Sequence, residues 1–158
     1  MTDITEPSYW LMKSEPDAYS IDSLKKEVVT LWDGIRNYQA RNFMRRMAIG
    51  DKVFFYHSNC KPPGIVGLME VTDLNIIDPT QFDKDSKYYD PKSNPDKPRW
   101  DCVQVKYLFK TNNFLSLPEL KILFNEKELL LVKKGNRLSI IPVKIEVANL
   151  ILKKIKKG

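Results

Sequence analysis

The chain has 158 residues, of which 42% are hydrophobic and 29% charged, and its formal net charge is +6. These values are typical of one globular domain and exclude an intrinsically disordered chain, and the apolar runs are far shorter than the roughly 20 residues of a membrane-spanning helix. The charge is uneven, because residues 121–158 hold 10 Lys and Arg against 3 Asp and Glu. This excess indicates either a phosphate-binding surface or a solvated helix face with a basic tail.

The N-terminal part of the sequence predicts a strand followed by two helices. Residues 9–12 are apolar and aromatic and predict a short strand. Ser20 stands where an N-cap is expected, and it predicts a short helix that starts at residue 21. A second helix is predicted from about Tyr38 to Met47, with Arg41 and Arg45 together on one of its faces.

The rest of the chain is predicted to be mostly strands. Segments rich in β-branched and aromatic residues predict strands at 53–57, 65–71, 100–110 and 138–141. The pattern Ser116-x-x-Glu119 is a capping box and predicts a helix over 117–124. A last helix is predicted to bury one stripe formed by Ile145, Ala148, Leu152 and Ile155.

Residues 75–99 form a polar segment without periodicity that contains four prolines. Such a segment inside a compact domain is usually functional or disordered. Strands outnumber helices, and no alternation of strand and helix runs through the chain. We therefore expect an α+β fold, with a curved, mostly antiparallel sheet or small β-barrel flanked by helices.

Little in the sequence indicates catalysis. His57 is the only histidine and is interpreted as a hydrogen-bonded structural residue, and no Cys/His cluster has the spacing of metal ligands. No nucleophile, phosphate-loop or dinucleotide motif occurs. Cys60 and Cys102 are expected to be reduced rather than disulfide-bonded, since no secretory signal is recognisable and a cytoplasmic location is expected. We expect no catalytic residues, no metal and no cofactor.

Polar and aromatic residues gather where the predicted strands end. They fall at 13–15, 32–34, 58–60 and 137–139. A flat ligand needs an aromatic face for stacking and a few donors and acceptors at its edge, and Trp32 beside Asp33 supplies both. The residues alone leave the alternatives open that Trp32 belongs to the core and that the nearby arginines are solvated.

Several blocks of the sequence resemble one family. They are YWLMKSEP at 9–16, WDGIRNYQARN at 32–42, FYHSNCKPPGI at 55–65, and GNRLS at 135–139. These blocks are similar, in the same order, to those of the EVE domain family, a member of the PUA-like superfamily and a relative of the YTH domain. The resemblance covers about residues 9–152 and implies a PUA-like, mostly antiparallel β-barrel flanked by helices. It indicates one domain at 9–155, between an N-terminal tail at 1–8 and a basic end at 156–158.

The resemblance also implies a pocket for a modified nucleobase, with modified cytosine in DNA as the first candidate and an RNA base as the second. Trp32 would then stack on the base, Asp33, Ser58 and Asn59 would bind its edge, and Lys13 and Ser14 would line the mouth. Arg36, Asn37 and Arg137 would contact phosphates or brace the pocket, and Cys60 belongs to the same ligand-binding set. The predicted phosphate contacts are Arg41, Arg45 and Lys61.

The function predicted from the sequence is thus non-catalytic binding of a modified base in nucleic acid, without a membrane partner. A functional association with a nuclease or helicase is a further expectation. Two alternatives remain open at this point. One is a nucleic-acid-processing enzyme that uses Cys60 or His57, and the other is a binder of a small metabolite that is not part of a polymer.

Overall fold

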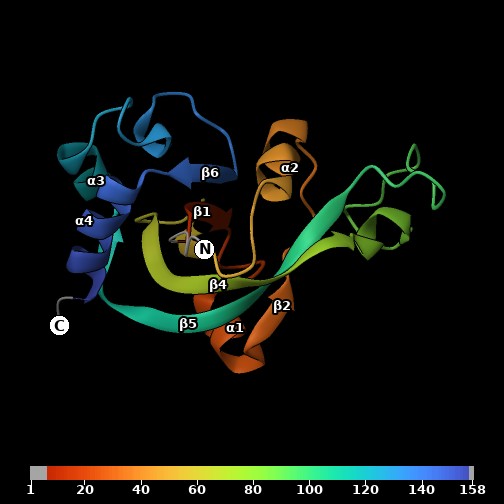
Figure 1. Ribbon diagram of the computed structural model, residues 1–158, viewed down its shortest axis with the longest axis horizontal. Coiled ribbons are helices and arrows are strands. Elements are labelled where there is room, and N and C mark those ends of the chain that lie inside the picture. The colour runs from red at the N-terminus through yellow and green to blue at the C-terminus, as the bar shows by residue number, and fades with distance from the viewer. Residues whose placement is uncertain (1–6, 157–158) are drawn as a thin grey trace, which may run out of the picture.

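The computed structural model describes residues 7–156 and contains one six-stranded sheet (Figure 1). The strands are β1 (Tyr9–Ser14), β2 (Val29–Leu31), β3 (Lys52–His57), β4 (Gly64–Ile77), β5 (Asp101–Ser116) and β6 (Ile140–Val143). The helices are α1 (Ile21–Glu27), α2 (Tyr38–Arg45), α3 (Leu117–Leu123) and α4 (Ile145–Lys156), with short 3₁₀ turns at Pro79–Phe82 and Leu130–Val132. No helix among the described residues is both long and apolar enough to cross a membrane.

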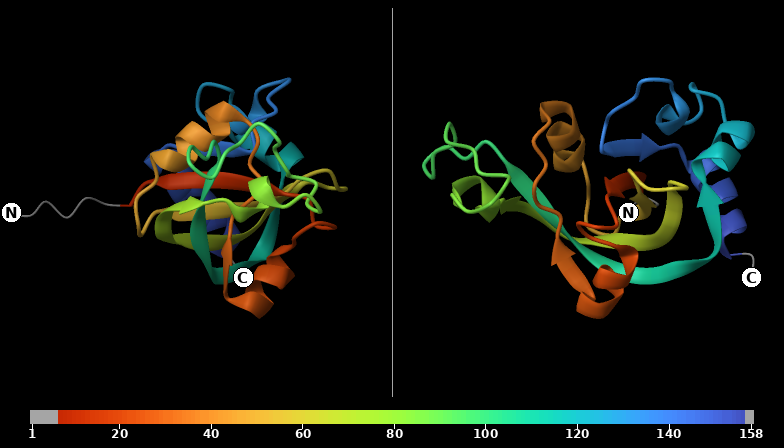
Figure 2. Two further views of the ribbon diagram at one scale, coloured as in Figure 1. Left: turned by 90° about the vertical axis from the view of Figure 1, so that its right-hand side faces the viewer. Right: turned by 180° about the vertical axis from the view of Figure 1, so that it is seen from behind.

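The sheet is mostly antiparallel and strongly curved, but it is open. Its strand order is β2-β5-β4-β3-β1-β6, and β1 with β3 is the one parallel pair within residues 7–156. Figure 2 shows β4 and β5 bending together around the molecule, and several register shifts interrupt their pairing. Such irregularities increase local twist and bend a sheet.

The α+β class and the curved, mostly antiparallel sheet flanked by helices are confirmed, but the sheet is not closed into a barrel. The edge strands β2 and β6 do not pair with each other in the described chain. They have three and four residues, and this short length leaves an opening between the two edges. β2 itself was not predicted from the sequence.

Local capping explains where the helices begin. The side chain of Ser20 accepts a hydrogen bond from the backbone N–H of Ser23, and the side chain of Asn37 accepts one from Ala40. Ser116 forms the predicted capping box of α3. Because side-chain oxygens satisfy backbone donors that have no partner within the helix, these caps fix each helix start. Helix α2 ends at Arg45, two residues before the predicted end.

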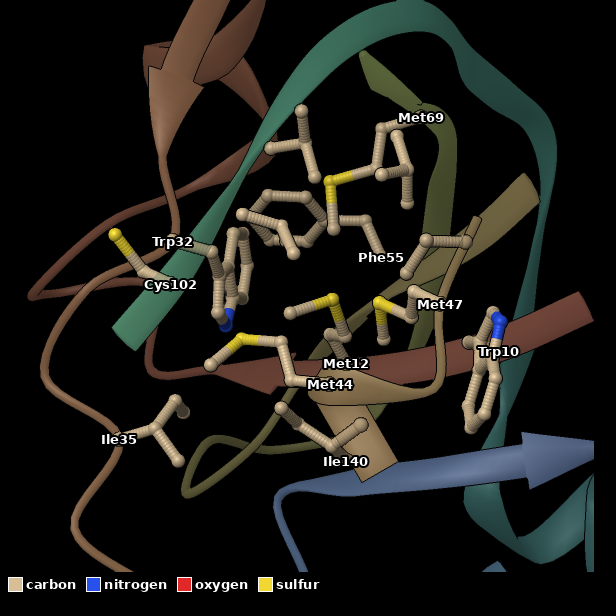
Figure 3. Packing of buried hydrophobic residues seen from close by; sticks show 14 of the residues in the cluster. Trp10, Met12, Trp32, Ile35, Met44, Met47, Phe55, Met69, Cys102 and Ile140 are labelled. Carbon is tan, nitrogen blue, oxygen red and sulfur yellow. The ribbon is translucent and has the colours of Figure 1, made fainter. Parts of the chain in front are cut away.

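Two apolar clusters lie on opposite faces of the sheet. Strand β1 sends Trp10 and Met12 into the first cluster and Leu11 into the second. Strand β3 alternates in the same way, which explains why both strands read as continuous apolar runs. Figure 3 shows the first cluster, where Trp32 lies among Met12, Met44 and Phe55.

Helix α4 closes the second cluster, and of the four predicted stripe residues Ala148 and Ile155 are buried, whereas Ile145 and Leu152 are not. Its buried residues are Val147, Ala148, Ile151 and Ile155. Ile145 is 37% exposed and Leu152 is half-buried. The apolar residues of α4 fit two neighbouring stripes, and only the tertiary packing decides between them.

The long polar segment after β4 is held by buried polar side chains. Gln81 donates to the carbonyls of Asp78 and Trp100, at 2.7 and 2.6 Å, and its side-chain oxygen accepts from the N–H of Trp100. The indole N–H of Trp100 donates to Asp90 at 2.8 Å. The segment therefore has a defined course, and it carries Tyr88 to the opening of the sheet.

Candidate functional site

A pocket of about 790 Å³ lies at the opening between the two sheet edges. Its walls come from the ends of β1 and β2, the segment 32–36 that follows β2, and the segment 137–139 that precedes β6. The lining also includes Ser58 after β3, the pair Lys87 and Tyr88, and four residues on or near α1, which are Glu15, Ala18, Tyr19 and Glu27. The volume is within the range of about 300–1,000 Å³ that is typical of small-molecule sites.

The pocket brings together most of the ligand-binding residues that the sequence predicts. Seven of the ten line it, from four separate parts of the chain: Lys13, Ser14, Trp32, Asp33, Arg36, Ser58 and Arg137. The other three, Asn37, Asn59 and Cys60, lie outside its lining. The opening of the sheet therefore joins segments that are more than 100 residues apart in sequence.

Trp32 is a core residue that also reaches the pocket. Its side chain is only 6% exposed, and it meets Phe55 and Tyr19 edge to face at centroid distances of 5.3 and 6.4 Å. Its backbone N–H donates to the carbonyl of Val103 at 2.8 Å. The indole is thus held rigidly, and it borders the pocket with a small part of its surface.

The indole N–H of Trp32 differs from those of the other two tryptophans in having no hydrogen-bond partner among the described residues. The indoles of Trp10 and Trp100 donate to Asp51 and Asp90, at 2.9 and 2.8 Å. Within residues 7–156 the indole N–H of Trp32 makes no hydrogen bond to the protein, and it is not a buried donor left without a partner. Trp32 lines the pocket, and it therefore has a donor there that is not used within the described chain.

The loop that follows Trp32 is anchored on a buried carboxylate. Asp78 is fully buried and accepts hydrogen bonds from the N–H of Gly34 at 2.8 Å and from Nη1 of Arg36 at 3.0 Å. Arg36 also donates to the carbonyl of Tyr88 and to the hydroxyl of Thr80, at 2.9 and 3.0 Å. Arg36 therefore braces the pocket, which is one of the two roles that the sequence left open for it.

Close packing fixes the same loop against Tyr88. Gly34 has a φ of +81°, and a Cβ at this position would lie 2.6 Å from the ring of Tyr88. Both the backbone conformation and the contact require glycine here. The ring of Tyr88 consequently lies directly against the loop that presents Asp33.

The pocket is lined by both acidic and basic side chains. Desolvation by the pocket walls raises the pKa of Asp33, the carboxylate of Asp78 raises it further, and Arg36 opposes both effects. Burial lowers the pKa of Lys13, whose Nζ lies 5.9 Å from the ring centre of Tyr56. Acids and bases therefore share one cavity, which suits a ligand that has both donors and acceptors.

The wall next to Lys13 contains a second hydrogen-bonded pair. The hydroxyl of Ser14 donates to the carbonyl of Tyr19 at 2.6 Å. The hydroxyl of Tyr19 donates to Glu27 at 2.6 Å, and partial burial together with this contact raises the pKa of Tyr19 to about 12. Tyr19 therefore stays protonated at neutral pH and keeps a fixed orientation beside Trp32.

Three predicted ligand contacts have structural roles in this chain. Asn37 caps α2, where its side chain accepts from the N–H of Ala40 at 2.9 Å. Asn59 has a φ of +51°, and its side chain donates to Glu15 at 3.1 Å. The thiol of Cys60 lies 3.6 Å from the carbonyl of Pro62, within the turn that joins β3 and β4. These contacts shape the rim but do not place the three side chains in the pocket lining.

The predicted phosphate contacts also lie outside the pocket lining. Arg41 stacks over the ring of Tyr38 and donates to the carbonyl of Arg99 at 2.9 Å. Arg45 forms an ion pair with Asp101 at 3.0 Å. Lys61 is exposed in the turn after β3. The two arginines are therefore already engaged within the protein.

His57 has the structural role that was predicted for it. Its Nε2 accepts a hydrogen bond from the N–H of Ile21 at 3.1 Å, at the start of α1. This bond requires an unprotonated Nε2, and burial lowers the pKa of His57. Residues 7–156 contain no cluster of His, Cys, Asp and Glu that would hold a metal ion.

Several pocket residues were not predicted as ligand contacts. They are Glu15, Ala18, Tyr19, Glu27, Thr30, Leu31, Gly34, Ile35, Lys87, Tyr88 and Ser139. Thr30 belongs to the unpredicted strand β2. The one available signal for Tyr88 was its position in a long polar segment of a compact domain, since such segments often carry function.

The fold and pocket can now be compared with known proteins. The model of the EVE domain family matches residues 8–154. This chain belongs to the EVE domain family. Thymocyte nuclear protein 1 from Homo sapiens is 48% identical over 125 residues, which cover 72% of this chain and 56% of that protein. The Danio rerio protein of the same name is 48% identical over 132 residues, covering 75% and 57%. This chain thus spans just over half the length of these relatives.

Solved EVE structures share the fold closely. The structure of human thymocyte nuclear protein 1 in complex with DNA containing 5-methylcytosine has a TM-score of 0.89 and 41% identity, covering 96% of this chain and 99% of that one. A protein from Pseudomonas syringae has a TM-score of 0.89 and 46% identity, covering 92% and 98%. The Pho92 YTH domain in complex with m6A, at a TM-score of 0.54 and 16% identity, shows a related fold alone.

Proposed function

We propose that this EVE domain binds a modified nucleobase in nucleic acid, with 5-methylcytosine or a related cytosine in DNA as the first candidate. The observation that carries this proposal is the pocket at the sheet opening, where Trp32 and Asp33 lie on one loop. The complex of the human relative with DNA containing 5-methylcytosine supports the ligand class. A modified RNA base remains the second candidate.

The polar groups of the pocket suit the edge of a cytosine. Cytosine has an exocyclic amino group that donates hydrogen bonds, and ring N3 and O2 atoms that accept them. The carboxylate of Asp33 is an acceptor for the amino group. The indole N–H of Trp32 and the hydroxyl of Ser58 are donors for the acceptor atoms. Tyr19 and Tyr88 add aromatic surface to the walls, so Trp32 need not provide the whole stacking face.

The site is rigid before the ligand arrives. The loop with Trp32 and Asp33 is fixed by Asp78, Arg36 and Tyr88, at the distances given above. A preorganised site loses little conformational entropy on binding. This matters because extracting a base from a stack costs a few kcal/mol, while stacking on aromatic residues returns about 1–3 kcal/mol per base.

The other predictions about function have weaker support. The enzyme alternative through His57 lacks a free imidazole, since Nε2 already accepts from Ile21. Arg41, Arg45 and Lys61 stay predicted phosphate contacts, although Arg45 would have to break its ion pair with Asp101. The association with a nuclease or helicase and the cytoplasmic location also stay predictions.

The test is a binding screen of short single-stranded oligonucleotides, each with one modified cytosine, one modified adenine or no modification. We expect wild-type protein to prefer a modified cytosine. Trp32→Phe keeps an aromatic ring in the core but removes the indole N–H, so we expect its affinity for that oligonucleotide to fall about fivefold, the effect of one neutral hydrogen bond. Equal affinity for the free modified nucleoside and for the oligonucleotide would favour the metabolite alternative. Equal affinity for all oligonucleotides would contradict recognition of a modified base.

A further inference from the structure

A second cavity, of about 690 Å³, adjoins the first. It lies between β1, α3 and the segment that connects the 3₁₀ turn Leu130–Val132 to β6. Tyr56 and Phe124 form part of its floor, and both are buried. The predictions from sequence assigned no ligand contact to the α3 part of this cavity or to residues 131–136.

Lys13 and the segment 133–139 separate the two cavities. Lys13 lines both of them. Residues 133–136 line the second cavity, whereas Arg137 and Ser139 line the first. The backbone N–H of Lys13 donates to the carbonyl of Ser139 at 2.9 Å, so the two walls are joined. A ligand that fills the first cavity and continues past Lys13 therefore enters the second.

The second cavity is strongly basic, in contrast to the first. Its lining holds four lysines, Lys13, Lys121, Lys133 and Lys134, and one acid, Glu126. The first cavity instead combines Lys13, Arg36, Lys87 and Arg137 with Glu15, Glu27 and Asp33. A cavity lined by one sign of charge concentrates ligands of the opposite sign.

The four lysines have no anionic partner in the described part of the chain. Within residues 7–156, no hydrogen bond or ion pair involves the ammonium group of any of them. By contrast, Arg36 and Arg45 form ion pairs with Asp78 and Asp101. On α2, Arg45 is paired with Asp101, and Arg41 has no anionic partner among the described residues but donates to the carbonyl of Arg99. The 133–134 turn therefore carries charge that is not engaged within the described chain and lies beside the pocket.

The turn that carries two of these lysines has a defined conformation. The N–H of Asn136 donates to the carbonyl of Lys133 at 3.1 Å, and its side chain donates to the carbonyl of Leu130 at 3.0 Å. Gly135 has a φ of +80° with open space beside it. Lys133 and Lys134 are thus exposed on a fixed turn whose backbone lines the cavity.

We infer that the second cavity is a phosphodiester subsite, which holds the backbone of the nucleotide adjoining the base in the first cavity. The inference rests on the proposed function for the base itself. It assigns phosphate contacts to Lys121, Lys133 and Lys134, with Lys13 at the junction. The backbone of the nucleic acid then runs along the 133–139 segment, while the base enters at the opening of the sheet.

The test compares two double variants with equal loss of charge. Lys133→Gln/Lys134→Gln removes two lysines of the second cavity, and Lys153→Gln/Lys154→Gln removes two from α4, outside both cavities. The probes are a single-stranded oligonucleotide with one 5-methylcytosine, the same strand with an abasic site at that position, and free 5-methyl-2′-deoxycytidine. Circular dichroism verifies the fold of each variant.

We expect the 133/134 variant to lose about tenfold in affinity for both oligonucleotides at low salt and to bind the free nucleoside like wild type. A plot of log K against log salt has a negative slope, and this slope should become shallower by about 1.4 in the 133/134 variant. Each lost phosphate contact accounts for about 0.7 of this change for a single strand. The 153/154 variant should bind each of the three probes with an affinity within twofold of wild type. Equal losses in the two variants, or no loss in the 133/134 variant, would overturn the inference.

The probes also separate this inference from the proposed function. If wild type binds the abasic strand through Lys133 and Lys134 but gains nothing from 5-methylcytosine, the phosphodiester subsite stands and the base assignment is wrong. If the 133/134 variant loses affinity equally for the free nucleoside, the turn supports the first cavity and the subsite is wrong.

Discussion

The guanidinium of Arg36 lies 3.0 Å from the buried carboxylate of Asp78, and this ion pair fixes the loop that presents Trp32 and Asp33. Asp78 also accepts from the backbone N–H of Gly34 at 2.8 Å. The pair therefore links the segment after β2 to the end of β4, across 42 residues of sequence. The shape of the pocket depends on this link more directly than on the surface charges of α2.

Asp78→Ala should destabilise the domain strongly. The change leaves the Arg36 guanidinium and the Gly34 N–H without their acceptor in a largely buried setting, and breaking one partner of a buried pair costs about 3–5 kcal/mol. The matched control is Asp101→Ala, which removes the partner of the more exposed Arg45 and should cost at most about 1 kcal/mol. Urea unfolding measures both free energies, and equal losses would contradict the bracing role of Asp78.

Gly34→Ala should cost more stability than a glycine substitution elsewhere with a similar backbone conformation. Gly50 also has a positive φ, of +95°, but nothing lies within 4 Å of the point that a Cβ would occupy there. Gly50→Ala therefore reports the backbone strain alone, about 1–2 kcal/mol. Gly34→Ala adds the clash with Tyr88, and Tyr88→Ala in that background should recover part of the loss. No recovery would show that the ring of Tyr88 is not the obstacle.

His57 should make the stability of the domain depend on pH. The pKa of His57 in the folded protein is below its ordinary value of 6.5, mainly through burial; Asp22 opposes this shift and Lys110 adds to it. Between the folded pKa and about 6.5 the unfolded chain binds more protons, so the free energy of unfolding decreases as the pH falls through this window.

The control for this prediction is His57→Gln, whose side-chain oxygen can accept from the N–H of Ile21 without titrating. The difference in unfolding free energy between wild type and His57→Gln should shrink as the pH falls below about 6.5. The free energies come from urea unfolding at several pH values. A difference that is constant over this window would mean that His57 does not titrate differently in the two states.

Elements with strong local signals were predictable from the sequence. The capping box at Ser116 and the N-cap at Ser20 start helices where expected. Strand β2 was missed because it has three residues and follows α1 after a single residue, Val28, with a φ of +72°. The closure of the sheet could not be predicted either, because it depends on whether two short edges meet.

The sequence identified motif residues that line the pocket. It was less successful where a motif residue supports the structure around the pocket. Trp32, Asp33 and Ser58 line the pocket, whereas Asn37 caps α2. The role of Arg45 depends on Asp101, which is 56 residues away in sequence. A partner at that distance leaves no local pattern, so the sequence does not distinguish a paired arginine from a free one.

The most direct test of base binding in the pocket uses the three tryptophan indole N–H signals in a ¹H–¹⁵N NMR spectrum. Trp10 donates to Asp51, and Trp32 has no protein acceptor within residues 7–156. On addition of an oligonucleotide with one 5-methylcytosine, the account predicts that the Trp32 signal shifts and exchanges more slowly with water, while the Trp10 signal stays in place. A Trp32 signal that does not change at saturating oligonucleotide would contradict the account.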